Sequence, residues 1–280
     1  GQPLGAADLH IVASPGRFHN AAIPLLRPAQ GAILVEKPLC YTEGELDEWL
    51  AFDTERRMQN KGGGFILHNS RFKPNVLAFM RHLQTYNPGR LISVDINYQS
   101  PSVGKHSPAW RRDERGSQTL LLDYSLHWLD LAMMFTRDAW TVKDLRWTMN
   151  KQGQTDLIEG RITSPQYAVN LCLRQGFIPK RCRVMFTFEN YLCSLGFFPD
   201  TFVPHMSFDS WSLYKKESKA NFRATFGKVV DKLTKKDSDN SHAVAMMGAL
   251  GDPRVSECMT IGAMQNIYRG LFVLSKAVYG

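Results

Sequence analysis

The sequence lacks a long apolar run, and it lacks cysteines spaced for a metal or redox site. No stretch approaches the roughly 18 apolar residues that span a bilayer, and the first residues show no charged region followed by the apolar core of a signal peptide. The five cysteines are odd in number and none forms a Cys-x-x-Cys pair; they are Cys40, Cys172, Cys182, Cys193 and Cys258. We therefore expect a cytoplasmic protein without membrane spans, disulfide framework or metal site, whose thiols are reduced and mostly buried.

The chain also lacks an even spread of positive charge. Its net charge is +8, but between Tyr214 and Lys236 eight basic residues stand against Glu217 and Asp231, so most of the excess belongs to this stretch. Charge confined to one segment argues against nucleic acid as the main partner. The segment is either a solvated loop and helix or a patch for an acidic partner or a phosphorylated substrate.

The N-terminal part alternates strand and helix patterns. A chain of 280 residues with 44% hydrophobic residues can bury a large core and usually forms two domains. The alternation predicts a parallel sheet with crossover helices. The strands are expected at Leu9–Ala13, Ala32–Val35 and Gly64–His68, and the helices between Ser14 and Leu26, over Thr42–Met58 and over Lys73–Leu83.

After Arg90 the strands follow one another too closely for crossover helices, which predicts a large, mostly antiparallel open sheet. We expect strands at Leu91–Gln99, Val142–Asn150, Asp156–Ile162, Ala168–Arg174, Arg183–Glu189 and Tyr191–Phe197, and helices at Thr119–Phe135 and Cys258–Val278. The fold class is α/β, with a partial Rossmann-type sheet over residues 1–88 and an α+β domain over 89–280. The boundary is predicted at the turn-forming residues Asn87-Pro88-Gly89.

Two short motifs carry chemistry. Glu36-Lys37-Pro38 follows an apolar strand, so it places a lysine at the carboxyl end of that strand. Asp123 and His127 are four residues apart, which puts a carboxylate and an imidazole one above the other on a helix. Together the motifs supply a cation, a proton acceptor and an orienting acid.

The order of these motifs resembles the glucose-fructose oxidoreductase, inositol dehydrogenase and MocA family of nicotinamide-dependent oxidoreductases. The resemblance covers nearly the whole chain and rests on Ser14-Pro15, His19, Glu36-Lys37-Pro38, Arg71-Phe72, Trp110-Arg111, Gly116 and Asp123-x-x-x-His127. It implies NAD or NADP as cofactor, a sugar, cyclitol or related hydroxy or carbonyl substrate, and a homodimer or higher oligomer formed through the open face of the sheet.

The resemblance also implies roles for individual residues. Oxidising a secondary alcohol needs a base of near-neutral pKa and a cation for the developing alkoxide. His127 suits the base, Lys37 the cation, and Asp123 can orient His127 or bond a substrate hydroxyl. Cofactor contacts fall to Ser14, Pro15, His19, Glu36 and Lys37, and substrate contacts to Arg71, Trp110, Arg111, Asp123 and His127.

Structural explanations compete at several of these positions. Ser14 could cap a helix with its hydroxyl, and His19 could be a solvated histidine in a first helical turn. Arg71 could simply open a helix. Lys37 and His127 could be a surface lysine and a polar residue of an amphipathic helix.

One feature of the family is missing. A Gly-x-Gly-x-x-Gly turn between a strand and a helix would cradle the cofactor pyrophosphate, and this sequence has none; Gly62-Gly63-Gly64 precedes a strand instead of following one. The missing half could precede this chain, belong to a separate polypeptide, or have been lost. We therefore expect the 280 residues alone to bind dinucleotide poorly.

Two functions remain open from the sequence. The first is an NAD(P)-dependent oxidoreductase, and the second is a non-catalytic descendant that serves as an oligomeric binding or scaffold subunit. Apolar residues on more than one face of the strands between Val142 and Phe197 predict that the uncovered sheet face packs against a second subunit, with the basic segment outside the interface. The aromatic run from Phe186 to Phe208 is expected in the core and at the sheet interface.

Overall fold

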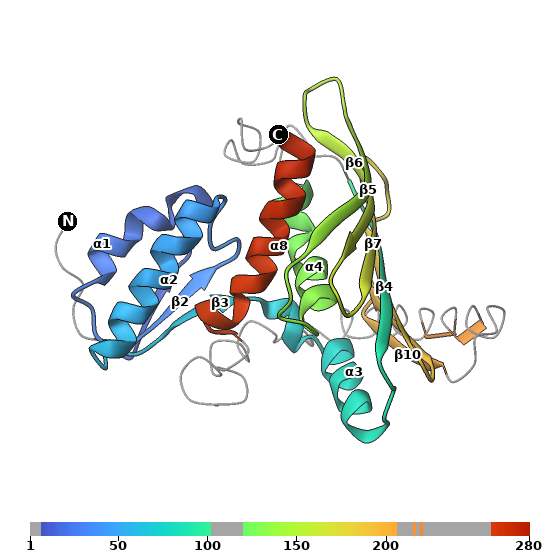
Figure 1. Cartoon of the computed structure of the whole chain (residues 1–280), viewed down its shortest axis with the longest axis horizontal. Helices are drawn as coiled ribbons and strands as arrows, with labels where there is room; N and C mark the ends of the chain where they lie inside the picture. Colours follow the sequence, from blue (N-terminus) through green and yellow to red (C-terminus); the bar gives the residue numbers. More distant parts are fainter. Residues whose placement is uncertain (1–6, 102–119, 206–214, 217–218, 221–258) are drawn as a thin grey trace, which may run out of the picture. The chain divides into compact units, whose positions relative to one another are not determined.

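The computed structural model describes residues 7–101, 120–205, 215–216, 219–220 and 259–280, which form two compact units (Figure 1). The first unit comprises Gly1–Asn69 and Ser241–Phe272, and the second comprises Ser70–Asn240 and Val273–Gly280. Trp110, Arg111, Gly116, Cys258 and almost all of the basic segment lie outside the described residues.

The first unit contains a three-stranded parallel sheet, as predicted. Its strands are β1 (Leu9–Val12), β2 (Ala32–Glu36) and β3 (Gly64–Leu67), in the order β1-β2-β3. β2 is central, and its Ile33, Leu34 and Val35 are fully buried. A central strand of a parallel sheet is covered on both faces, which accounts for its continuous apolar run.

The helix expected between Ser14 and Leu26 is broken into short pieces. Two 3₁₀ turns, η1 (Gly16–Phe18) and η2 (Asn20–Ala22), precede α1 (Ile23–Leu26). Pro24 in the first turn of α1 has no N–H to continue a helix from its N-terminal side, and Pro28 follows closely. The prediction of one helix here is therefore wrong.

The helix α2 (Glu43–Met58) covers the sheet and begins with a complete capping box. Thr42 accepts a hydrogen bond from the Glu45 backbone N–H at 3.2 Å, and the Glu45 carboxylate accepts from the Thr42 N–H at 3.1 Å. Its buried side chains include Leu46, Trp49 and Phe52. The helix thus starts where the sequence predicted, because both partners of the cap are encoded locally.

Arg56 of α2 holds the connection between α1 and β2. The residue is 1% exposed, and its guanidinium donates to the backbone carbonyls of Leu26, Ala29, Gly31 and Lys61 at 2.5 to 3.2 Å. Burial lowers the pKa of this guanidinium, and nearby Asp53 opposes that shift. Arginine satisfies this site because its planar fork presents several donors at once.

The second unit is built on a seven-stranded sheet in the order β10-β9-β8-β4-β7-β6-β5. All neighbouring strands are antiparallel except β4 and β7, which confirms the prediction of a mostly antiparallel sheet. The strands are β4 (Leu91–Ser100), β5 (Thr141–Met149), β6 (Thr155–Thr163), β7 (Ala168–Gln175), β8 (Arg181–Phe188), β9 (Leu192–Phe197) and β10 (Thr201–His205).

The two faces of this sheet differ in chemistry. On one face Val94, Ile96 and Tyr98 are at most 2% exposed, and α3 (Pro74–Thr85) and α4 (Leu126–Met133) pack against the sheet (Figure 1). The other face carries mostly polar and charged side chains in register, among them Asp95, Asn97, Asn170 and Arg183, together with Cys172 and Met185. The expectation that the second face is apolar is therefore wrong, because strict alternation in the central strands sends their apolar residues to one side.

The contacts divide the chain between Asn69 and Ser70, ahead of the predicted boundary at residues 88 and 89. The difference arises from α3, which packs on β9 and β10 of the second unit. Asn75 at its start donates to the Gly196 carbonyl at 2.7 Å. The last helix, α8 (Ile261–Tyr279), is shared, with residues up to Phe272 in the first unit and the rest in the second.

Three further expectations concern absences. Among the described residues no helix is long and apolar enough to cross a membrane, and no three metal-binding side chains gather. The four described cysteines are free thiols, and Cys40, Cys182 and Cys193 are buried, as the sequence predicted. Burial raises the pKa of the Cys193 thiol to about 12.

Candidate functional site

The carboxyl ends of the three parallel strands gather their loops at one edge of the first unit. The loop after β1 begins at Ala13, the loop after β2 at Lys37, and the loop after β3 at His68. In open α/β sheets this edge is the usual place for a ligand. Ser14, Glu36 and Lys37 lie at this edge, and cofactor contacts by them remain a prediction.

The loop after β2, residues 37–41, is held by contacts on both sides of the lysine. The Lys37 backbone N–H donates to the Glu36 carboxylate at 3.2 Å, and both side chains are half-buried. Leu39 is fully buried, and its N–H donates to the Tyr268 hydroxyl of α8 at 2.8 Å. The Tyr41 N–H donates to Glu45 at 2.7 Å.

The loop after β1 packs directly on this loop. At Gly16 an added Cβ would lie 2.9 Å from the Tyr41 ring and 3.1 Å from the Pro38 ring, so only glycine permits the approach. This glycine serves loop packing within the protein. Ser14 is exposed and Pro15 half-buried, and among the described residues no side chain caps the following turn, so the capping explanation for Ser14 is not supported.

His19 lies inside the unit. It is 0% exposed, and its Nε2 pairs with the Ser14 carbonyl at 2.7 Å, so the ring is not solvated. Burial lowers the pKa of His19, and backbone hydrogen bonding at Ser14, Leu39 and Pro38 opposes the shift. A buried neutral imidazole between the two loops supports their geometry, and its role in cofactor contact remains a prediction.

His68 and Tyr268 belong to this region, although the sequence analysis did not select them. Both are fully buried, their rings meet edge to face at 6.1 Å, and His68 Nε2 lies 3.5 Å from the Tyr268 hydroxyl. A polar residue at the end of a buried strand was the available signal for His68. Tyr268 gave none, since its partner Leu39 is remote in sequence.

The second unit holds Asp123 and His127 in two different helical segments. Asp123 belongs to a π-helical turn, η6 (Leu120–Tyr124), and His127 to the first turn of α4. Ser125 closes the π turn, because its N–H and its hydroxyl both donate to the Leu120 carbonyl at 3.0 and 2.5 Å. The prediction of one continuous α-helical face is therefore wrong; π turns of this kind are frequent at functional sites. Asp123 is buried and His127 half-buried.

Arg71 is engaged by a residue that the sequence analysis did not select. Its Nε and NH2 groups donate to the two carboxylate oxygens of Asp130 at 2.8 and 2.7 Å. Asp130 is 0% exposed and lies one turn after His127 on α4. Because this fork already binds a carboxylate in a bidentate manner, Arg71 fixes the 3₁₀ turn η3 (Asn69–Phe72) onto α4. A substrate contact by Arg71 remains a prediction.

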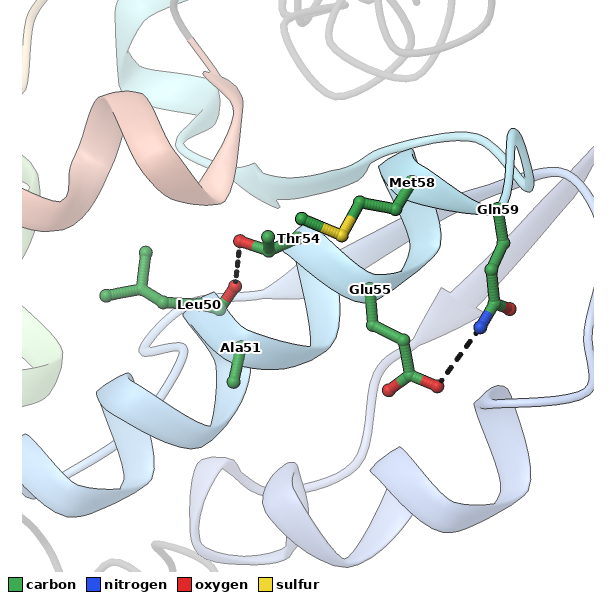
Figure 2. A pocket seen from close by; sticks show the side chains of 6 residues that line it. All are labelled: Leu50, Ala51, Thr54, Glu55, Met58 and Gln59. Atoms are coloured by element: carbon green, nitrogen blue, oxygen red, sulfur yellow. Dashed lines mark hydrogen bonds between the residues drawn. The ribbon is translucent and has the colours of Figure 1, made fainter.

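Lys37 belongs to the first unit and Asp123 and His127 to the second, so their convergence on one cleft stays a prediction. A shallow hollow of about 490 Å³ on the outer side of α2 contains none of the predicted site residues. Figure 2 shows its lining, where Thr54 donates to the Leu50 carbonyl and Gln59 to Glu55. Its walls are the surface of a single helix, and it adds nothing to the candidate site.

Comparison with known proteins places the fold. No protein-family model and no curated protein sequence matches the chain. UDP-N-acetylglucosamine 3-dehydrogenase of Acidithiobacillus ferrooxidans matches with a TM-score of 0.67 and 15% identity, over 95% of this chain and 77% of that one. The chain shares the fold of a dehydrogenase.

Two further solved structures agree. The myo-inositol dehydrogenase of Lactobacillus casei, solved in complex with NAD(H) and myo-inositol, matches with a TM-score of 0.65 and 12% identity, over 97% of this chain and 75% of that one. The dehydrogenase MviM of Clostridium difficile matches with a TM-score of 0.60 and 12% identity, over 98% and 79%. These neighbours confirm the predicted two-part architecture.

Proposed function

We propose that this protein is an oxidoreductase that transfers hydride between a nicotinamide cofactor, NAD or NADP, and a sugar, cyclitol or related hydroxy or carbonyl compound. The observation that carries the proposal is the position of Lys37, at the carboxyl edge of a parallel sheet in a chain with the fold of sugar and inositol dehydrogenases. The edge offers a cation in a loop with a fixed backbone.

The chain's own residues supply the acid-base chemistry in this proposal. In the oxidative direction His127 accepts the hydroxyl proton of the substrate, and the Lys37 ammonium stabilises the developing alkoxide. Asp123 orients His127 or bonds a neighbouring substrate hydroxyl. In the reductive direction His127 donates the proton to the substrate oxygen, and the Lys37 ammonium stabilises the negative charge that develops on that oxygen.

The first unit fits the nicotinamide end of the cofactor better than the pyrophosphate. Ser14 and Lys37 provide a hydroxyl and an ammonium at the carboxyl edge, which suits the nicotinamide end; bound there, nicotinamide would accept or donate the hydride. Among the described residues no glycine-rich turn leads from a strand into a helix, so none of the described connections offers the pyrophosphate an amide cradle of that kind. Gly62, Gly63 and Gly64 lie at the start of β3, at the opposite edge from Lys37, as the sequence indicated.

The proposal includes the assembly and the compartment that the sequence suggested. We propose a homo-oligomer in the cytoplasm, with small-molecule substrates. The support for assembly is now the resemblance alone, since the open sheet face is polar.

The direct test is oxidation of a panel of polyols, aldoses and nucleotide sugars with NAD and NADP, followed by the absorbance of the reduced nicotinamide. We expect turnover of at least one substrate and a loss of about 100- to 1,000-fold in kcat in Lys37→Met. The matched control is Lys61→Met, because Lys61 bonds the Arg27 carbonyl away from the carboxyl edge.

Equal rates in Lys37→Met and wild type would remove Lys37 from the chemistry. No turnover and no cofactor binding in the whole panel would favour the alternative of a non-catalytic binding subunit.

A further inference from the structure

We infer that Tyr268 is a positioning residue, whose hydroxyl fixes the loop that carries Lys37. The inference rests on the proposed function for its catalytic consequence, but its structural part stands by itself. Tyr268 lies on α8 and reaches the loop from 229 residues away in sequence, within the first unit. Nothing in the local sequence of the loop encodes this contact.

The hydrogen bond falls between the two ends of the loop. At the start, Glu36 accepts from the Lys37 N–H; at the end, Glu45 accepts from the Tyr41 N–H as an extension of the capping box of α2. Leu39 lies between these anchors, and its N–H donates to Tyr268 at 2.8 Å. The Tyr268 hydroxyl is therefore the anchor for the middle of residues 37–41.

The surroundings make this anchor necessary. Leu39 and Tyr268 are both 0% exposed, so water does not replace the hydroxyl as acceptor without a rearrangement. A buried backbone N–H without a partner is costly, and the loop would move to satisfy it. Pro38, which is packed against Gly16, transmits that movement to Lys37, its neighbour in the chain.

The hydrogen bond to the Leu39 N–H also explains why position 268 is a tyrosine and not a phenylalanine. Phe272, one turn further along α8, packs beside Tyr268 with ring centroids 6.2 Å apart. The hydrophobic part of the site therefore needs only an aromatic ring. The hydroxyl serves Leu39, and it meets His68 Nε2 at 3.5 Å on its other side.

The experiment compares Tyr268→Phe with Tyr279→Phe in the full chain. Tyr279 is a matched control on the same helix, because its hydroxyl also makes a hydrogen bond, with the Thr155 hydroxyl at 3.1 Å, but in the second unit. Hydrogen exchange of the Leu39 amide is measured first, without cofactor or substrate. We expect its protection to fall about tenfold or more in Tyr268→Phe and to stay unchanged in Tyr279→Phe. Protection of the β3 amides reports whether the unit remains folded.

Kinetics then test the catalytic consequence. In Tyr268→Phe we expect kcat to fall by about 10- to 100-fold with little change in KM, because the cation is misplaced while substrate contacts remain. The pH profile of kcat should shift as well, whereas Tyr279→Phe keeps both. Unchanged Leu39 exchange in Tyr268→Phe overturns the positioning role. A kcat of Tyr268→Phe equal to that of Tyr279→Phe overturns the catalytic consequence. A wild-type chain without turnover overturns the proposed function and the catalytic consequence together, while the exchange result still decides whether Tyr268 holds the loop.

Discussion

His19 shows how a single side chain joins two loops of the candidate site. Its ring is fully buried, with Nε2 on the Ser14 carbonyl of the loop after β1 and with backbone hydrogen bonding at Pro38 and Leu39 of the loop after β2. Burial lowers the pKa of this imidazole below its ordinary value of 6.5. The ring is therefore neutral in the folded protein at neutral pH and supports the loops without adding charge.

This burial has a consequence for stability as a function of pH. A histidine whose pKa is lowered by folding takes up its proton more readily in the unfolded chain, so stability is retained above about pH 6.5 and lost as the pH falls below it. Burial lowers the pKa of His82 too, with the same sign. We expect His19 to decrease the free energy of unfolding below pH 6.5 by up to about 1.4 kcal/mol per pH unit.

Urea unfolding between pH 7.5 and 5 measures this slope. His19→Leu should be less stable than wild type at pH 7.5, because the Ser14 carbonyl loses its partner, but its slope should be shallower by up to one proton. Identical slopes in the two proteins would show that His19 is not held neutral by folding.

Among the elements, α2 stabilises the loop that carries Lys37, because the first turn of this helix bonds the end of the loop. Its capping box satisfies the first amides of the helix, and the same Glu45 carboxylate accepts from Tyr41 in the loop. We expect Thr42→Ala to lower the free energy of unfolding by about 1 kcal/mol. Thr54→Ala is the control, since Thr54 is an exposed residue of the same helix and its hydroxyl donates to the Leu50 carbonyl (Figure 2).

Thermal or urea unfolding of the two variants tests the cap. Thr54→Ala should stay within about 0.5 kcal/mol of wild type, as expected for an exposed helix position. A Thr42→Ala variant that matches Thr54→Ala would mean that the capping box contributes nothing to the start of α2.

The elements that the sequence predicted well are those whose signals are local. The helix pattern over Thr42–Met58 predicted α2, and the apolar run at Ala32–Val35 predicted β2. β10 was not predicted, because Pro204 in the pattern argues against a strand; an edge strand tolerates it, since one side of the strand has no ladder to complete.

The candidate site was less predictable than the fold, because its supporting contacts are remote in sequence. Lys37 was found from its place after an apolar strand. The π turn is a local exception, since it depends on two hydrogen bonds from Ser125 to the Leu120 carbonyl. Arg71, in contrast, is paired with Asp130, fifty-nine residues away. Tyr268 is further still from Leu39, and no periodicity connects these partners.

For the whole molecule, the open face of the seven-stranded sheet is the surface through which we propose that the chain assembles. That face holds a shallow hollow of about 480 Å³ whose polar lining includes Asp95 and Asn170, themselves hydrogen-bonded at 2.7 Å. A polar face is compatible with a subunit interface, but it does not require one, as an apolar face would.

Sedimentation equilibrium at tens of micromolar tests the proposed oligomer. We expect a dimer or higher oligomer, which becomes weaker with Arg183→Glu because Arg183 lies on the open face and the substitution reverses its charge. The control is Arg17→Glu on the first unit, which should leave the mass unchanged. A monomer at these concentrations would remove the proposed assembly.

The proposed function requires that Lys37 of the first unit and His127 of the second act on the same reacting atoms. A double-mutant cycle on kcat/KM measures this directly, with Lys37→Met, His127→Gln and the double variant in the full chain. If the two groups serve one transition state, the double variant should be about as slow as the slower single variant. Losses that simply multiply, or a His127→Gln variant as fast as wild type, would contradict a shared site.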